Sequence, residues 1–312
     1  MNFNAPTASN SAAILEKLNI KPGKLDLVVD TDAFNEIDDQ FAIAYALRSP
    51  ERINLCALYA APFFNSLSSS PADGMEKSYH EIRRVLERMH DPRASDESFV
   101  LRGSEGYLPD GDTPVESDAA RDLVRRALAA KDVLYVAAIG AITNVASAIL
   151  MEPKIVDKLV LIWLGGHAPG WSSTKEFNLK QDIHAARVVL DSGVPLVLIP
   201  CCGVADRLTL SVPELERWLD GKNALGTYLT ENVRRALADD PGDFPGAARV
   251  IWDISAIAYI INPDWLPADI IPSPLLTDNV TWSFDHNRHL IKTVRWINRC
   301  GVFRDLFEKL AR

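Results

Sequence analysis

The sequence lacks the features that mark several common classes of protein. Only four of its 312 residues are cysteine, and their spacing matches neither a zinc site nor a disulfide framework. No apolar run approaches the about 20 residues that span a membrane, and the chain shows no basic segment followed by an apolar core near its start. We therefore expect a cytoplasmic protein without a signal peptide and without a membrane partner.

Positive charge and linker composition are also scarce. The net charge is -9 and no cluster of lysine and arginine stands out, so we expect a small-molecule partner and no nucleic acid. No stretch is rich enough in proline, glycine or serine to separate domains, and no internal repeat occurs. We expect a peripheral N-terminal arm at residues 1–23 and a single domain at residues 24–312.

Hydrophobic residues make up 47% of the chain and form strand-like runs that alternate with helical patterns. The predicted strands are residues 25–29, 53–60, 99–103, 133–140, 158–166 and 195–200. Continuous Val/Ile/Leu strands separated by helices indicate an α/β fold with a central, mostly parallel sheet flanked by helices on both faces. The most loop-like stretches are residues 66–74 and 239–248, either of which could cover a site.

One stretch, "VVDTDAFNEIDDQFAIAYAL" at residues 28–47, holds an unusual density of negative charge between apolar flanks. Its acidic residues are Asp30, Asp32, Glu36, Asp38 and Asp39. Acidic residues at a helix start are often simple caps, and the helix dipole can hold one or two carboxylates. Four carboxylates converging at the end of a buried strand instead indicate a hard cation, calcium or magnesium.

Polar groups also follow the other predicted strands. Asn65 follows the second strand, Ile139 and Gly140 follow the fourth, and Glu176 and Asn178 follow the fifth. Because ligands of open parallel sheets bind at the carboxyl ends of the strands, we expect these groups to meet the acidic stretch at one edge.

A DxD sequence after the first strand is also typical of magnesium-dependent phosphatases of the haloacid dehalogenase class. Such an enzyme uses the first aspartate as a nucleophile and needs a downstream lysine and a second acidic cluster. The later strands end in "AIGAITN", "LGGHAPG" and "IPCCG", which supply no such cluster. This interpretation therefore ranks lower.

Four separate motifs resemble the inosine–uridine-preferring nucleoside hydrolases. The acidic stretch is similar to that family's D-x-D-P-G-x-D-D-A signature, and "AIGAITNVASAI" to its G-P-L-T-N-(I/L)-A segment. "LGGHAPGWSSTKEFNLKQDIHAA" is similar to its G-G…A-E-F-N…D-P-x-A-A segment, and "WDISAIAYIINP" resembles the stretch with its last metal-binding aspartate. The resemblance covers about residues 24 to 265 and implies the nucleoside hydrolase fold.

The resemblance implies a calcium centre and a catalytic base. Asp32 would bind calcium and deprotonate the attacking water. Asp39, Asp253 and the backbone carbonyl of Ile139 would be further calcium ligands, and Asp30 would bind or support the same centre. N-glycosidic cleavage passes through an oxocarbenium-like sugar, which a nearby carboxylate stabilises.

The same resemblance implies a sugar site. Asp38 would hold a ribose hydroxyl, and the remaining sugar contacts would come from Asn65, Glu176, Asn178 and the main chain around Leu164.

The sequence departs from the family pattern at several positions. "AFNEI" makes the first loop two residues longer, and Gly170, beside Trp171, stands where the family has an asparagine. Trp252 precedes Asp253 where pyrimidine-accepting members often have histidine, which resembles the purine-specific branch. We expect Trp252, with Trp171 or Phe64, to stack on a purine, or else Trp252 to pack in the core.

Two further groups lie on the expected site side of the sheet. His167 follows a pair of glycines and could contact substrate or protonate the leaving base, but an exposed loop histidine is the favoured interpretation. Cys201 and Cys202 follow the last strand and fit buried small residues better than nucleophiles.

The sequence thus predicts calcium-dependent hydrolysis of ribonucleosides to free base and ribose, with a suspected purine preference. The competing hypothesis is a non-catalytic nucleoside or ribose binder, which the presence of Asp32 argues against. The resemblance implies a homodimer or homotetramer. The preferred base is left open, because loops form the base pocket.

Overall fold

The computed structural model describes residues 11–239 and 248–312. The predicted N-terminal arm lies partly outside these residues, as does nearly all of the predicted loop at 239–248. The helices are α1 (Ser11–Lys17), α2 (Asp39–Leu47), α3 (Pro71–Arg88), α4 (Asp118–Ala129), α5 (Thr143–Met151), α6 (Phe177–Gln181), α7 (Ile183–Ser192), α8 (Val212–Trp218), α9 (Ala224–Asp239), α10 (Ile254–Ile261) and α11 (Arg299–Leu310). The strands are β1 (Leu25–Thr31), β2 (Ile53–Ala60), β3 (Val100–Arg102), β4 (Leu134–Ala138), β5 (Leu159–Leu164), β6 (Leu196–Ile199), β7 (Thr209–Ser211), β8 (Ala248–Val250), β9 (Ala268–Pro272), β10 (Leu275–Leu276), β11 (Trp282–Ser283) and β12 (Leu290–Val294).

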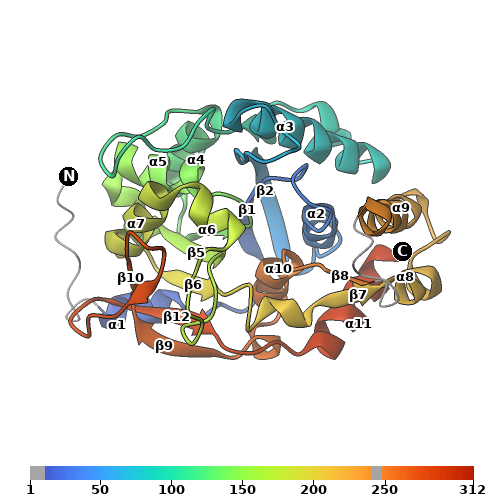
Figure 1. Cartoon of the computed structure of the whole chain (residues 1–312). Helices are drawn as coiled ribbons and strands as arrows, with labels where there is room; N and C mark the ends of the chain where they lie inside the picture. Colours follow the sequence, from blue (N-terminus) through green and yellow to red (C-terminus); the bar gives the residue numbers. More distant parts are fainter. Residues whose placement is uncertain (1–10, 240–247) are drawn as a thin grey trace.

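An eight-stranded sheet in the order β3-β2-β1-β4-β5-β6-β12-β9 forms the centre of the molecule (Figure 1). All neighbouring strands in it are parallel except β9, which pairs antiparallel with β12 at the edge. The predicted α/β fold with a mostly parallel sheet and flanking helices is confirmed. The structure adds β12 and β9 to the six strands that the sequence predicts.

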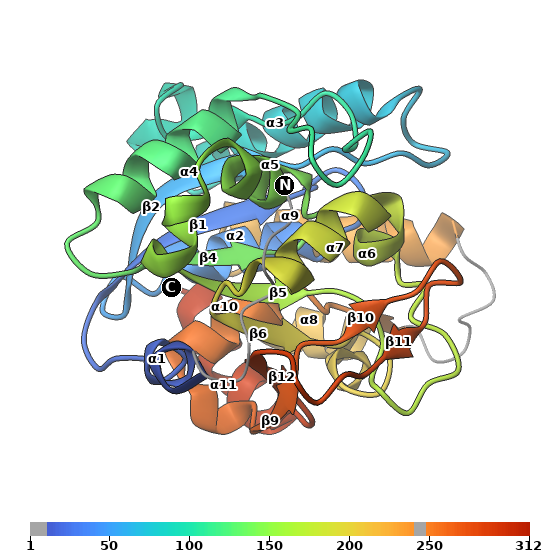
Figure 2. The same ribbon diagram turned by 90° about the vertical axis from the view of Figure 1, so that its left-hand side faces the viewer.

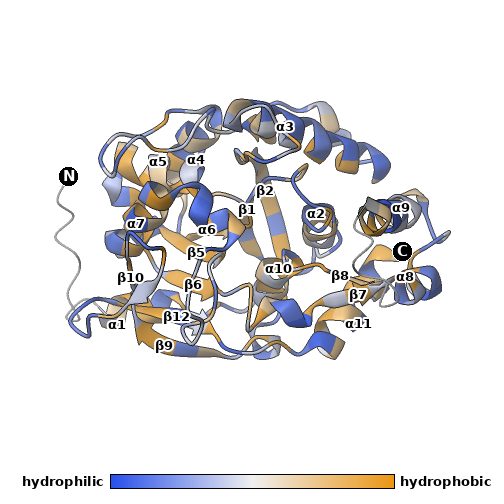
Figure 3. Cartoon of the chain, viewed as in Figure 1, coloured by the Kyte–Doolittle hydropathy of each residue, from blue (hydrophilic) through white to orange (hydrophobic). Residues whose placement is uncertain are grey.

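The apolar strands bury side chains on both faces of the sheet. Along β5, Val160 and Ile162 point into one hydrophobic core, whereas Leu161 and Trp163 point into the other. Helices α2, α10 and α11 cover the first core, and α4, α5 and α7 cover the second. Figure 3 shows the same arrangement as hydrophobic strands inside a shell of helices with polar outer faces. A strand buried on both faces has one continuous apolar run, which explains why these strands could be predicted from the sequence.

Helix α3 begins inside the stretch that the sequence predicted to be a loop. Ser70 accepts a hydrogen bond from the backbone N–H of Asp73, and Pro71 occupies the first turn. A serine N-cap followed by proline starts a helix efficiently, because proline has no N–H to leave unpaired there. The prediction of a loop over all of residues 66–74 was therefore wrong from Pro71 onward.

Helix α1 packs at the far end of the sheet, beside β12 (Figure 2). Ile14 and Leu18 are buried, and the Lys292 ammonium donates to the carbonyl of Leu18 at 2.9 Å. Among the described residues, no helix is both long and apolar enough to cross a membrane.

Candidate active site

The candidate site lies at the carboxyl ends of four neighbouring strands. Asp32 follows β1, Ile139 follows β4, Leu164 ends β5, and Cys201 comes shortly after β6. These strands are adjacent and parallel, so their ends bring together residues from distant parts of the sequence. The prediction that polar groups converge on this edge is confirmed for the groups that line the cavity described below.

Two helix N-termini add carboxylates to this edge. Asp38 is the N-cap residue of α2, with Asp39 next to it, and Asp253 is the N-cap residue of α10. The backbone N–H of Asp253 donates to Asp38 Oδ2 at 3.1 Å, and the Thr31 hydroxyl donates to Asp39. Carboxylate oxygens of the three aspartates all lie within 4.8 Å of one another. The positive ends of two helix dipoles favour this arrangement but cannot neutralise three buried charges.

The lengthened first loop is held in place by Gln40. Its amide nitrogen donates to the carbonyls of Ala33 at 2.9 Å and Glu36 at 3.3 Å. Gln40 is 4% exposed, so these bonds form away from solvent. Phe34 and Glu36 in this loop are exposed, whereas Asp38 and Asp39 are buried at the helix start.

Asp30 and Asp32 each have an unsatisfied oxygen. Both side chains are buried, and within the described part of the chain neither Oδ2 atom has a hydrogen-bond partner. The other oxygen of Asp30 accepts from Asn144 Nδ2 at 2.7 Å. Buried polar atoms are nearly always paired, so the unpaired Oδ2 of Asp32, which lines the cavity described below, suits a cation or a polar ligand.

Burial raises the pKa of every carboxylate in this group. It raises the pKa of Asp30 and of Asp39 to about 7, and neighbouring charges add to the effect of burial in raising the pKa of Asp32 and Asp253 well above the usual range. A bound divalent cation reverses this balance, because it favours the ionised carboxylates. The donor set is all oxygen, which fits calcium or magnesium and not a soft metal.

The raised pKa values predict how stability depends on pH in a chelator. The folded protein binds protons that the unfolded chain releases near the ordinary carboxyl value of 3.8. Stability should therefore fall as pH rises toward about 7, by about 1 kcal/mol per pH unit for each such proton. Calcium should remove this slope. Urea denaturation between about pH 5 and 8, with chelator and with calcium, measures both curves; a chelated protein whose stability rises across this range would contradict the prediction.

Glu176 and Asn178 form the facing wall. The Glu176 carboxylate is the N-cap of α6 and accepts hydrogen bonds from three backbone N–H groups at 2.8 to 3.0 Å. The Asn178 side-chain amide donates to the carbonyls of Ile139 and Leu164, at 3.2 Å each. These bonds fix both side chains before any ligand arrives, which is the preorganisation that a binding site needs.

His167 and the two cysteines lie at the same wall. His167 Nδ1 accepts from the backbone N–H of Cys202 at 3.3 Å, and burial lowers the pKa of His167. The ring of Trp171 lies 5.6 Å from the His167 ring, but 51% of Trp171 is exposed. Burial and nearby carboxylates raise the pKa of the Cys201 thiol well above its usual range, so Cys201 stays protonated and is not a nucleophile.

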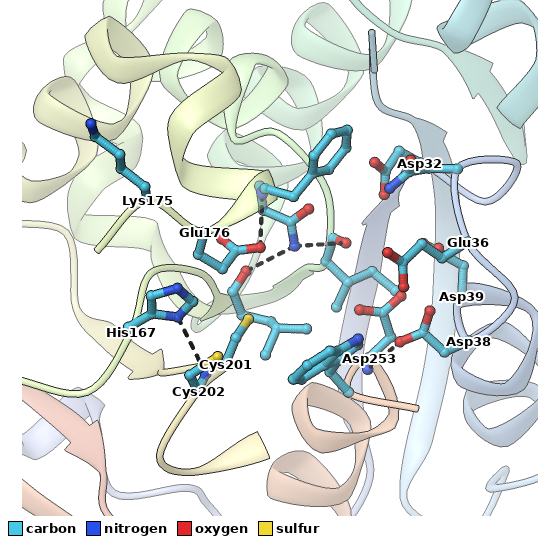
Figure 4. A pocket seen from close by; sticks show the side chains of 16 residues that line it. Asp32, Glu36, Asp38, Asp39, His167, Lys175, Glu176, Cys201, Cys202 and Asp253 are labelled. Carbon is cyan, nitrogen blue, oxygen red and sulfur yellow. Dashed lines mark hydrogen bonds between the residues drawn. The ribbon is translucent and has the colours of Figure 1, made fainter. Parts of the chain in front are cut away.

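These groups enclose a cavity of about 200 Å³ (Figure 4). Asp32, Glu36, Asp39 and Asp253 face Glu176 across it. The predicted site residues that line it are Asp32, Asp38, Asp39, Ile139, Leu164, His167, Glu176, Asn178, Trp252 and Asp253.

Four predicted residues lie outside this cavity. Asp30 is buried but does not line it, the Trp171 and Phe64 rings are exposed, and Asn65 lines a second, adjoining cavity, where its amide donates to Asn35 Oδ1 at 2.7 Å. Sequence reasoning gave no role to the other lining residues, which are Asn35, Glu36, Lys175, Phe177, Cys201 and Cys202. Phe177 could have been predicted as a lining residue, because it stands between the predicted site residues Glu176 and Asn178.

Comparisons with known proteins agree with this geometry. Residues 27–297 match the protein family described as "Inosine-uridine preferring nucleoside hydrolase". The chain is 26% identical over 265 residues to the pyrimidine-specific ribonucleoside hydrolase RihA of Salmonella paratyphi C. This alignment covers 77% of this chain and 80% of RihA. Among solved structures, the plant nucleoside hydrolase PpNRh1 has a TM-score of 0.74 at 18% identity, covering 92% of this chain and 99% of its own. The purine-preferring ribonucleoside hydrolase of Gardnerella vaginalis has a TM-score of 0.71 at 17% identity, covering 92% of this chain and 98% of its own.

Proposed function

The chain belongs to the inosine-uridine preferring nucleoside hydrolase family, and from this premise we propose that it hydrolyses ribonucleosides to free base and ribose in a calcium-dependent reaction. The observation that carries the proposal is the buried group of Asp38, Asp39 and Asp253 beside Asp32, whose Oδ2 has no partner among the described residues. A purely structural cluster of this kind would be strongly destabilising without a compensating charge.

We assign calcium to the oxygen atoms at this edge. The proposed ligands are Asp32, Asp39, Asp253 and the Ile139 carbonyl, with Asp30 supporting them from behind. When bound, calcium supplies the positive charge that these carboxylates require, and it orients water and ribose hydroxyls. The grouping of Asp38 with Asp39 and Asp253 makes Asp38 a further candidate ligand, in addition to its proposed contact with a ribose hydroxyl.

Asp32 is the proposed general base. It removes a proton from a water molecule as the water oxygen bonds to C1′ of the sugar and the bond from C1′ to the base nitrogen breaks. The electron pair of that bond leaves with the base, which then gains a proton. The surrounding carboxylates stabilise the positive charge that develops on the sugar in the transition state.

The facing wall is the proposed sugar site. Glu176 and Asn178 line the cavity, and we propose that they hold ribose hydroxyls together with the main chain around Leu164. Their existing backbone contacts orient them, so binding needs little rearrangement. Asn65 lies one cavity away, so we propose that it acts through Asn35 and not by direct contact with the sugar.

Two residues, His167 and Trp252, are proposed to assist the departure of the base. His167 lines the cavity with Nδ1 already accepting a hydrogen bond, which leaves Nε2 for a substrate contact. Trp252 is half-buried in the cavity lining and can stack on the base, although it also packs against the core. The names of the relatives cover both purine- and pyrimidine-directed enzymes, and we propose a purine preference from Trp252.

Replacing Trp252 with alanine tests the stacking role. The expected result is about a tenfold weaker binding of a purine nucleoside analogue, because a stacked ring and its buried area are lost. Trp171→Ala is the matched control, since that ring lies outside the cavity and should leave binding unchanged. Unchanged binding in the Trp252 variant would assign Trp252 to the core alone.

The activity itself is tested by ribose release from inosine, guanosine, adenosine, uridine and cytidine, with and without a calcium chelator. Release that the chelator abolishes supports the proposal and ranks the bases. Calcium binding without release from any nucleoside would support the alternative, a non-catalytic nucleoside or ribose binder.

A further inference from the structure

A second cavity of about 480 Å³ adjoins the catalytic one. Asn35, Glu36 and Phe177 line both cavities, so the two share a wall. The second cavity lies among the first loop, α3 and α9, and apart from Asn65 its other lining residues have no role in the reaction proposed above.

The two cavities differ in size. Small-molecule sites in proteins typically measure about 300 to 1,000 Å³, and the 200 Å³ between the carboxylates and Glu176 falls below this range. A nucleoside whose sugar lies there can extend its base into the second cavity, which supplies more than twice that volume. It has room for a base that carries a substituent.

The walls of the second cavity suit a heterocycle. Phe34, Phe177 and Tyr228 contribute aromatic side chains, and Asn232 contributes a side-chain amide. The Asn232 amide donates to Gln40 Oε1 at 3.4 Å, which connects α9 to the residue that holds the catalytic loop. The wall and the loop therefore form one supported surface.

The charge of the second cavity differs from that of the catalytic one. Arg84, Arg235 and Arg249 line it, in a chain whose net charge is -9. The carboxylate of Glu81, 2% exposed, is already used, because it accepts from Arg84 and from the Tyr228 hydroxyl. The combined cavity thus runs from an acidic catalytic end to an arginine-lined far end.

Arg235 is the cation at this end that is available to a ligand. It is exposed on α9, and within the described part of the chain no carboxylate pairs with it. Its neighbour Arg234 instead forms ion pairs with Glu216 and Asp220, at 2.9 Å each, and does not line the cavity. Arg234 and Arg235 are therefore adjacent on one helix, but among the described residues only Arg234 forms ion pairs with carboxylates.

We propose that the second cavity binds the base of the substrate and selects bases that carry an anionic substituent, such as a carboxylate, through Arg235. This inference rests on the proposed hydrolase function and names its substrate class. The base extends from the catalytic cavity, which Trp252 lines, into the second cavity, and its anionic group reaches Arg235 at the far end.

The experiment compares nucleosides that differ only in charge. The first pair is 5-carboxymethyluridine and 5-carbamoylmethyluridine, and the second is N6-carboxymethyladenosine and N6-carbamoylmethyladenosine, each beside its unsubstituted parent. The wild type should have a kcat/KM about tenfold higher for the acid than for the matched amide, and the ratio should fall as salt rises. Arg235→Gln should bring the ratio close to one, whereas Arg234→Gln should keep it.

The outcomes separate this inference from the function on which it rests. Hydrolysis of parents and amides with a ratio near one in the wild type would overturn the anionic preference and leave the hydrolase intact. No hydrolysis of any member would overturn both. A preference for uridine 5′-phosphate over uridine that Arg235→Gln removes would place the sugar end, not the base, in the second cavity, and would also overturn the inference.

Discussion

Replacing Asp32 with asparagine should lower the rate of ribose release by about 10³-fold or more. General-base catalysis contributes about 10²- to 10⁴-fold, and loss of a negative charge beside the developing oxocarbenium adds to this. The substitution is nearly isosteric at a side chain that is 1% exposed, so the fold should persist. The measurement is kcat from initial rates of ribose release at saturating calcium and nucleoside.

The control for this variant is Asp118→Asn, whose carboxylate is 66% exposed at the start of α4. It makes the same chemical change away from the cavity and should keep wild-type activity. An Asp32 variant that retains calcium and its thermal transition yet works within tenfold of the wild type would exclude Asp32 as the base.

Replacing Asp253 with asparagine should strongly weaken calcium binding and activity while stabilising the chelated protein. Coulombic repulsion from Asp38, Asp39 and Asp32 adds to burial in raising the pKa of Asp253, so removing this charge relieves the metal-free cluster. Without one ligand, calcium affinity should fall by about 100-fold or more, and kcat by about 10³-fold at fixed calcium. Calorimetric titration with calcium and thermal unfolding in chelator measure the two effects.

The Asp253 prediction is specific because calcium affinity should fall while stability in chelator should rise. A structural aspartate at a helix N-cap would lose stability on substitution, in chelator and in calcium alike. An Asp253 variant that is less stable than the wild type in chelator, and still responds to calcium, would contradict the assignment of Asp253 as a ligand.

The sheet and its acidic edge could be predicted from local sequence. Apolar runs buried on both faces, such as β1 and β5, are visible without knowledge of their neighbours, and Asp30 and Asp32 directly follow such a run. Parallel pairing then requires the strand ends to meet. Asp253 was different, because 214 positions separate it from Asp39, and only the resemblance to a known family connected it to the site.

The remaining features depend on tertiary packing that no short pattern encodes. Trp171 and Asn65 stand in loops, so their distance from the catalytic cavity depends on how those loops fold back. The aromatic and arginine lining of the second cavity comes from the first loop, α3, α6, α9 and β8, which are separated along the chain. The start of α3 at Pro71 was the exception, since Ser70 and Pro71 together form a readable helix signal.

The central claim is that nucleoside hydrolysis depends on calcium held by the buried carboxylates. Its most direct test is to restore calcium stepwise to the chelated wild-type protein and to measure ribose release and calcium-dependent thermal stability in the same samples. The account predicts that ribose release saturates with the same calcium dissociation constant that fits the logarithmic rise of thermal stability, since one site serves both. Full ribose release in the chelator, or release that rises at a calcium concentration unrelated to the stabilisation, would contradict it.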